Sequence, residues 1–263
     1  MSAVREIWDR RELLWELVWK EIRLRYRRSA LGFLWSLLHP LLMMGVFTLV
    51  FSRFPKIMGE LPVPYYIFFL VGYLAWNYFS VSISNSHMSV IANATLVKQV
   101  YFPRQALPLA AVIANFFHIV IAFALLILFL FAFTPYLSYR VAFFPVVILI
   151  ESVLILGFSL LLSSLNVFFR DVGQILEVVL TFWFYLTPVF YPLSIFGPED
   201  HWLVSMLKLN PLTEVVALYR WCLLDGFGFE PFMIAYPLVF GVLFLLFGHH
   251  VFSKLEPSFA KEL

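Results

Sequence analysis

The sequence predicts an all-α integral membrane protein with six transmembrane helices, an N-terminal amphipathic interface helix and short re-entrant helices between spans five and six. Of its 263 residues, 62% are hydrophobic and 13% are charged, whereas soluble domains carry about 25% charged residues. Aromatic residues make up 19%, more than a soluble core of this length can cover with polar groups. The apolar runs are continuous rather than alternating, which favours helices over the strands of a closed barrel.

The N-terminal residues 5–26 show the pattern of an amphipathic surface helix, and we assign residues 1–30 to a cytoplasmic interface helix. At 100° per residue, polar and apolar side chains fall on opposite sides. The polar side consists of Arg5, Asp9, Glu12, Glu16, Lys20 and Arg23, and the apolar side of Leu14, Leu17, Val18 and Ile22. Three flanking tryptophans favour a position at the headgroup level of the membrane. A plain anchor and a docking surface for a soluble partner both fit this pattern.

Six apolar segments follow. A helix needs about 20 mostly apolar residues to cross a hydrocarbon core about 30 Å thick. The segments that meet or approach this length are residues 31–51, 65–83, 107–133, 141–165, 175–191 and 232–252. They leave no room for a sizeable soluble domain, so residues 31–263 are assigned to one six-span transmembrane domain.

The basic residues predict the orientation of these spans. Eight of the 18 Lys and Arg residues precede the first span, and the positive-inside rule therefore places the N-terminus in the cytoplasm. Six crossings return the C-terminus to the same side. The first apolar run is too long for a signal peptide and is interpreted as a signal anchor. The net charge of +2 is too small to suggest a nucleic-acid partner.

The inner loop, residues 84–106, is long enough for a short helix ending before Pro103. It is expected to expose four side chains that suit a protein interface. These are Lys98, Tyr101, Phe102 and Arg104. The alternative is that the two aromatic rings only dip into the membrane surface.

The outer segment, residues 192–231, holds two apolar stretches that are too short to cross a membrane. Asn210 and Pro211 separate them and form a helix start signal. Non-helical backbone at membrane depth survives only where protein covers it or where it lines a wet cavity. A transport pathway is therefore expected near this segment, and Pro188 breaks the fifth span just before it.

No nucleotide or metal site is expected in this chain. It contains no G-x-x-x-x-G-K-[ST] and no H-E-x-x-H pattern, and its six histidines are dispersed. The single cysteine, Cys222, excludes an intrachain disulfide and a cysteine metal cluster.

Glu151 is the acid that lies deepest within a predicted span, and such a carboxylate is a functional candidate because its ionised form is costly in lipid. The favoured interpretation is a hydrogen-bonded structural residue, because no second buried acid continues a proton relay. His118 is a candidate partner or simply a packed polar residue.

Aromatic side chains recur in spans one and five. Their ring faces can stack on sugar rings without fixed hydrogen bonds, so a glycan can slide past them. The candidate channel residues are Trp35, Phe47, Phe51, Phe182, Tyr185, Phe190 and Tyr191. Contact with lipid or with a second subunit is the alternative for each of them.

Several strings resemble a known family along essentially the whole chain. They are KEIRLRYRRSALGFLWSLLHPLLMM (20–44), VKQVYFPRQALPL (97–109), LNVFFRDVGQILEVVL (165–180), FWFYLTPVFYPLSIF (182–196) and LNPLTEVVALYR (209–220). In these strings the chain is similar to the membrane subunit of ABC exporters for O-antigen polysaccharides and polyol-phosphate wall polymers.

The resemblance implies a permease in the bacterial inner membrane that forms a homodimer and binds two copies of a separate ATPase. ATP would be bound by that partner, so the permease itself needs no cofactor. The interface helix and the inner loop would contact the ATPase, which assigns docking to Trp8, Glu12, Lys98, Tyr101, Phe102 and Arg104. Spans one and five would border a channel at the dimer axis, and the outer segment would lie at its mouth. The implied substrate is a lipid-linked glycan on a polyprenyl pyrophosphate.

Two other functions remain open from the sequence. One is a drug or lipid exporter of similar architecture, which does not need an aromatic path suited to sugars. The other is a membrane enzyme acting on lipid-linked sugars. Its base would be Glu151 or one of the outer acids Glu199, Asp200, Glu214 and Asp225.

Overall fold

The computed structural model of the chain describes residues 3–26, 34–51, 61–197 and 201–263. Within these ranges the regular structure is helical, apart from one antiparallel bridge between Leu137 and Leu224. The all-α prediction is therefore confirmed for the described part of the chain.

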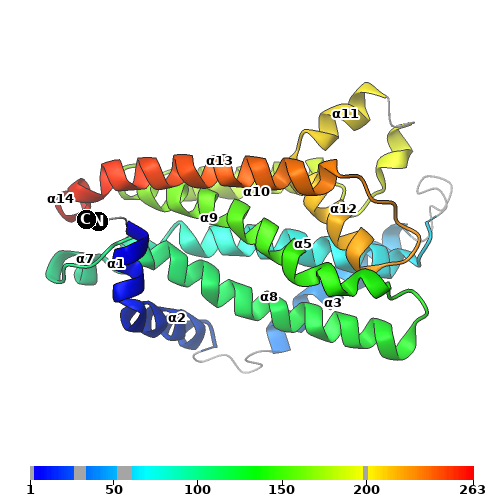
Figure 1. The fold of residues 1–263 in the computed structure, drawn as a ribbon, viewed down its shortest axis with the longest axis horizontal. Coiled ribbons are helices and arrows are strands. Elements are labelled where there is room, and N and C mark those ends of the chain that lie inside the picture. The colour runs from blue at the N-terminus through cyan, green and yellow to red at the C-terminus, as the bar shows by residue number, and fades with distance from the viewer. Residues whose placement is uncertain (1–2, 27–33, 52–60, 198–200) are drawn as a thin grey trace.

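Within the described ranges, four helices are long and apolar enough to cross a membrane. They are α5 (Tyr65–Ser86), α8 (Ala106–Phe133), α9 (Phe144–Phe168) and α13 (Phe232–Leu255). Each coincides with a predicted span. In Figure 1 they run along the length of the molecule, with α5 inside the bundle.

Two further apolar helices, α3 (Leu34–Phe51) and α10 (Val172–Leu186), occupy the predicted first and fifth spans. Both are shorter than the other four in their apolar parts. At 1.5 Å per residue, α10 is about 22 Å long, less than a hydrocarbon core. It ends at Leu186 because Pro188, two residues on, cannot continue a helix. The predicted start of the first span, residues 31–33, lies outside the described residues.

Helices α9 and α13 pack closely against each other. Gly157 and Gly248 face each other across this contact, and a methyl group added to Gly248 would overlap the carbonyl oxygen of Gly157. At Gly157, an added methyl group would lie 2.7 Å from the backbone nitrogen of Leu245. Small residues of this kind let two backbones approach closely without relying on hydrophobic burial.

The two ends of the bundle carry different short helices (Figure 1). One end holds both termini and the helices α1 (Ala3–Asp9), α2 (Arg11–Tyr26), α6 (Ser89–Ala92), α7 (Ala94–Gln99) and α14 (Phe259–Glu262). The other end holds the short turns η1 (Tyr139–Phe143) and η2 (Leu193–Phe196) and the helices α11 (Trp202–Lys208) and α12 (Pro211–Leu223). Two short helices, α11 and α12, thus lie within residues 192–231 as predicted, with Asn210 and Pro211 at the start of the second.

The predicted amphipathic helix corresponds to α1 and α2. Its apolar side packs against α8, where Leu17 and Val18 are buried. They belong to a hydrophobic cluster apart from the main core, called the second hydrophobic cluster, with Val90, Val97, Phe102, Phe252 and Phe259. Trp8, Trp15 and Trp19 stay exposed. The apolar side therefore contacts protein, and the tryptophans are the side chains left for a membrane surface or a partner.

Candidate functional site

A groove of about 680 Å³ lies between α3, α5 and α10. Two of its walls are single helix faces. The first wall is formed by Tyr73, Trp76, Ser80, Ser84 and His87 along α5, and the second by Gly173, Glu177, Thr181 and Tyr185 along α10. Side chains three or four positions apart share one face of a helix. The two helices therefore present continuous stripes to the same space.

The aromatic part of the groove begins at Phe47 on α3. Its ring lies 5.8 Å from that of Phe51 and 5.5 Å from that of Phe190, measured between ring centroids. Phe47 and Tyr185 line the groove directly. Four predicted channel residues thus gather here, drawn from two segments more than 130 positions apart in sequence.

The other three predicted channel residues lie elsewhere. Trp35 and Phe182 are exposed but do not line this groove. Tyr191 is 6% exposed, and its hydroxyl donates to the main-chain oxygen of Tyr185 at 2.9 Å. The prediction that Tyr191 offers a ring face to a channel is wrong for this chain, because the turn after Pro188 packs that ring against Phe190 and Phe196.

The polar side chains of the groove were missed by the sequence analysis. Ser80, Ser84, His87, Glu177 and Thr181 are all in its lining. A signal was present, since serines stand at every second position from Ser80 to Ser86, around the end of the second predicted span, and Glu177 lies within the fifth. Such groups can exchange hydrogen bonds with hydroxylated ligands and with water.

The outer end of α10 is held by two residues of the α12 region. Asn210 accepts a hydrogen bond from Trp183 Nε1 at 2.9 Å and donates one to Thr187 Oγ1 at 2.9 Å. Arg220 donates to the main-chain oxygen of Val189 at 2.7 Å, and its guanidinium carbon lies 3.5 Å from the ring centroid of Phe68. Arg220 thus supplies a polar partner to the backbone that Pro188 leaves outside the helix, and Asn210 binds two side chains at the end of α10. The outer segment and the end of the groove are therefore one packed unit.

Comparison with known proteins supplies the family. The family model described as "ABC-2 type transporter" matches residues 12–224. The chain belongs to this family. It is a transport permease and not an enzyme.

Three relatives are similar over most of their length. The O-antigen export system permease protein RfbA of Myxococcus xanthus is 37% identical over 84% of this chain and 83% of its own. The protein of the same name from Klebsiella pneumoniae is 31% identical, over 96% of this chain and 95% of its own. The polysialic acid transport protein KpsM of Escherichia coli is 27% identical, over 91% and 92% respectively.

The described acids that were considered as a catalytic base do not line the groove. Burial raises the pKa of Glu214 to about 7, a value that would suit a base. However, Glu214 is 1% exposed and does not line the groove. Asp225 lies 3.5 Å from Arg140, and Glu199 and Asp200 fall outside the described residues. The expectation that no second acid is buried besides Glu151 is wrong, because Glu214 is buried as well.

Glu151 is expected to be structural. It is fully buried, and its Oε2 accepts a hydrogen bond from the hydroxyl of Tyr219 on α12 at 2.8 Å. Replacing it with glutamine keeps an acceptor for that hydroxyl, so transport should stay close to the wild-type level. Replacing it with alanine leaves the hydroxyl unpaired and should cost about 2 kcal/mol of stability. Lost transport in Glu151→Gln, with normal folding and normal ATP hydrolysis, would contradict this role.

The predicted docking residues divide into two groups. Trp8, Glu12, Lys98 and Tyr101 are exposed, and the side chain of Tyr101 is 79% exposed. Phe102 is 2% exposed, so its prediction as an exposed docking residue is wrong. Its ring fills the second hydrophobic cluster together with Phe259 from the C-terminal helix. Arg104 is half-buried and binds Glu256 within the chain.

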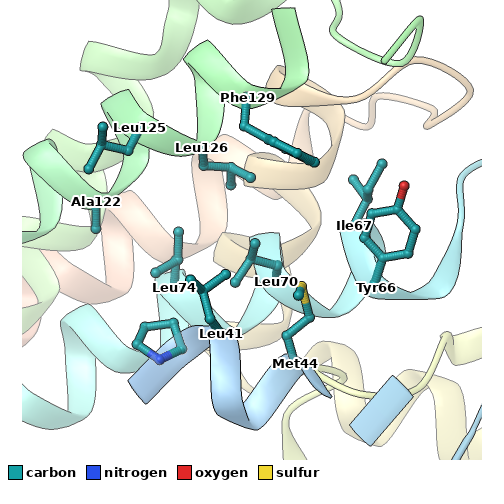
Figure 2. Close-up of a pocket in the computed structure, with 11 residues that line it drawn as sticks. Leu41, Met44, Tyr66, Ile67, Leu70, Leu74, Ala122, Leu125, Leu126 and Phe129 are labelled. Atoms are coloured by element: carbon teal, nitrogen blue, oxygen red, sulfur yellow. The ribbon is translucent and has the colours of Figure 1, made fainter. Parts of the chain in front are cut away.

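A second cavity, of about 370 Å³, has a different chemistry. Figure 2 shows side chains from α3, α5 and α8 that surround it. They include Leu41, Met44, Leu70, Leu74, Leu126 and Phe129. This lining offers hydrocarbon contacts and has no charged group to hold a sugar or a phosphate. The groove beside α10 is therefore the better candidate for a hydroxylated ligand.

Proposed function

We propose that this permease is the six-span membrane subunit of an ATP-driven exporter for a lipid-linked polysaccharide. Two copies would pair so that their α3–α5–α10 grooves form one channel, and two copies of a separate ATPase would supply the energy. The observation that carries this proposal is the groove itself, because it combines aromatic ring faces with hydroxyl groups along two helix faces. The relatives named for O-antigen export and polysialic acid transport support a polysaccharide as substrate.

The position of Glu177 supports a wet channel rather than a lipid-facing surface. Glu177 is exposed on α10 and lines the groove, and a carboxylate facing hydrocarbon costs several kcal/mol. Around it α3 and α10 expose apolar side chains, among them Val46, Leu49, Val178 and Phe182. A second copy covering these residues would enclose the groove and leave Glu177 in water.

Transport of a drug or a lipid would not account for the polar side chains of the groove. A drug or lipid exporter would gain nothing from a row of hydroxyl groups and a carboxylate in its path.

We also infer that both termini and the inner loop face the cytoplasm of a bacterium, across its inner membrane. Eight basic residues before the first span support that side, and α1, α7 and α14 share one end of the bundle (Figure 1).

Tyr185→Ala is expected to lower polymer export about tenfold, the equivalent of about 1.4 kcal/mol. The change removes one ring face from the groove while the main-chain contact to Tyr191 remains. Polymer on the outer side of intact cells is measured together with ATP hydrolysis and assembly of the complex. Phe131→Ala is the matched control, because Phe131 is an aromatic residue of α8 that is 76% exposed and does not line the groove. Normal export in Tyr185→Ala would reject the groove as the path.

Tyr101→Ala is expected to weaken binding of the ATPase about thirtyfold, since truncating an interface anchor costs about 2 kcal/mol. The ring stands out from the inner loop beside Arg10, whose guanidinium donates to the Tyr101 main-chain oxygen at 2.6 Å. Co-purification of the ATPase with the permease measures the effect. Tyr139→Ala is the control, because Tyr139 is 86% exposed and belongs to η1, far from the inner loop in the sequence. Equal co-purification of both variants would show that Tyr101 is not an anchor.

A further inference from the structure

The inner end of α13 carries three polar side chains that neither the groove nor ATPase docking uses. His249, Ser253 and Glu256 are spaced by four and three residues and so share one face. All three meet the inner loop. His249 Nδ1 lies 3.1 Å from Gln105 Oε1, and Gln105 Nε2 donates to Ser253 Oγ at 3.0 Å. The amide of Gln105, a residue that is 5% exposed, is therefore occupied at both its oxygen and its nitrogen.

Arg104 adds two contacts to the same helix end. Its main-chain nitrogen donates to Glu256 Oε1 at 2.9 Å, and its guanidinium donates to the main-chain oxygen of Glu256. The adjacent Phe102 packs in a cluster with Phe252 and Phe259, which are both fully buried. Packed cores of this kind transmit displacement because they hardly compress. The inner loop and the end of α13 thus share both polar contacts and an apolar core.

The outer end of α13 is attached to the outer segment. Lys208 Nζ lies 3.2 Å from Glu230 Oε2, directly before α13, and the hydroxyl of Tyr236 on α13 donates to the main-chain oxygen of Leu209. At 1.5 Å per residue the 24 residues of α13 extend about 36 Å between these attachments. One helix therefore connects the end that carries Tyr101 to the outer segment beside the groove.

We propose that Arg104 and Gln105 hold the inner loop to α13, so that the loop and the sixth span move together. The movement that ATP hydrolysis causes in the ATPase is then transmitted through α13 to the outer segment. The proposal rests on the proposed function, because it needs the ATPase to act at this end of the bundle. Arg104 is then a positioning residue and not a docking anchor. Tyr101, three residues earlier, has the anchor's role, because it is 79% exposed while the Arg104 guanidinium is hydrogen-bonded to Glu256 within the chain.

The first test links the inner loop to α13 by a covalent bridge. Gln105→Cys and Ser253→Cys are combined in a Cys222→Ala background and bridged with a short bis-maleimide. If loop and helix move together, the bridged permease exports polymer at the rate of the same double variant before bridging. A loss of export upon bridging would mean that the two parts must separate during transport, which overturns the proposal.

The second test separates positioning from docking. Arg104→Ala is expected to co-purify with the ATPase as the wild type does, and to lower the polymer exported per ATP hydrolysed at least tenfold. Glu256→Gln keeps a side-chain oxygen for the Arg104 main-chain nitrogen and should retain most of the coupling, whereas Glu256→Ala should lose it. Loss of the ATPase from Arg104→Ala, or an unchanged ratio of export to hydrolysis, overturns the proposal.

The wild-type complex distinguishes this proposal from the function on which it rests. A wild type without ATP-dependent export contradicts the proposed function itself. A working wild type together with a failing bridged variant contradicts only the connection between the inner loop and α13.

Discussion

Replacing Arg220 with methionine is expected to destabilise the permease by about 3 kcal/mol and to abolish most polymer export. The methionine fills much of the same space but cannot donate, so the main-chain oxygen of Val189 loses its 2.7 Å partner. A buried carbonyl left without a partner costs about 1–3 kcal/mol, and a hydrogen bond from a charged group contributes about 1.5–3 kcal/mol. The stacking of the guanidinium on Phe68 is lost as well.

The effect on transport follows from the position of this contact. Val189 lies in the turn that Pro188 creates between α10 and the outer segment, and the next residue is the groove-end aromatic Phe190. Loosening the turn should therefore displace the outer end of the groove.

Thermal denaturation of the purified permease in detergent and polymer export in cells measure the two effects of Arg220→Met. Arg220→Lys should be intermediate, because an ammonium can reach one carbonyl but does not stack as a guanidinium does. Arg170→Met is the stability control, since Arg170 is exposed. Full stability and full export in Arg220→Met would show that the turn after α10 holds its shape without this residue.

Gly248→Ala is expected to destabilise the permease by about 3 kcal/mol or more by forcing α9 and α13 apart. The added methyl group would overlap the carbonyl oxygen of Gly157, and backbone cannot rotate away as a flexible side chain can. Overpacking of a close-packed contact typically costs about 1–3 kcal/mol, with backbone clashes at the upper end.

Gly45→Ala is the matched control for this helix contact. It makes the same chemical change within α3, and in the described part of the chain no atom outside the helix's own backbone and the neighbouring residues lies within 4 Å of the added methyl group. Because glycine is about 1 kcal/mol less favourable than alanine inside a helix, Gly45→Ala should be neutral or slightly stabilising. Equal thermal stability of the two variants would mean that α9 and α13 are not held at the distance described here.

Features that depend on a single stretch of chain were predictable. The span predicted at 107–133 is the helix Ala106–Phe133, and the break predicted at Asn210 and Pro211 is the start of α12. Apolar length, proline and capping residues act locally, so their consequences can be identified without knowing the rest of the fold. The strings that resemble polysaccharide exporters likewise predicted the family, which the family comparison confirms.

Which side of each helix is covered by another helix was not predictable. Phe182 and Tyr185 are three residues apart on one helix, yet only Tyr185 lines the groove. Tyr101 and Phe102 are neighbours, yet one ring is exposed and the other is buried against the C-terminal helix. Successive side chains of a helix point about 100° apart, so any four consecutive residues cover all of its sides. The neighbouring helices then decide which of these side chains face a cavity.

The sequence by itself thus determined the helical class, the apolar lengths, the breaks and the family of this permease. Only the tertiary structure decided the partners of its polar groups. Arg104 meets Glu256 across 152 positions, Arg220 meets Val189 across 31, and Glu177 comes to lie beside Ser80 and Ser84 in one groove. Such pairs leave no periodic trace in the chain, because a buried polar group needs a partner but does not specify where along the sequence that partner lies.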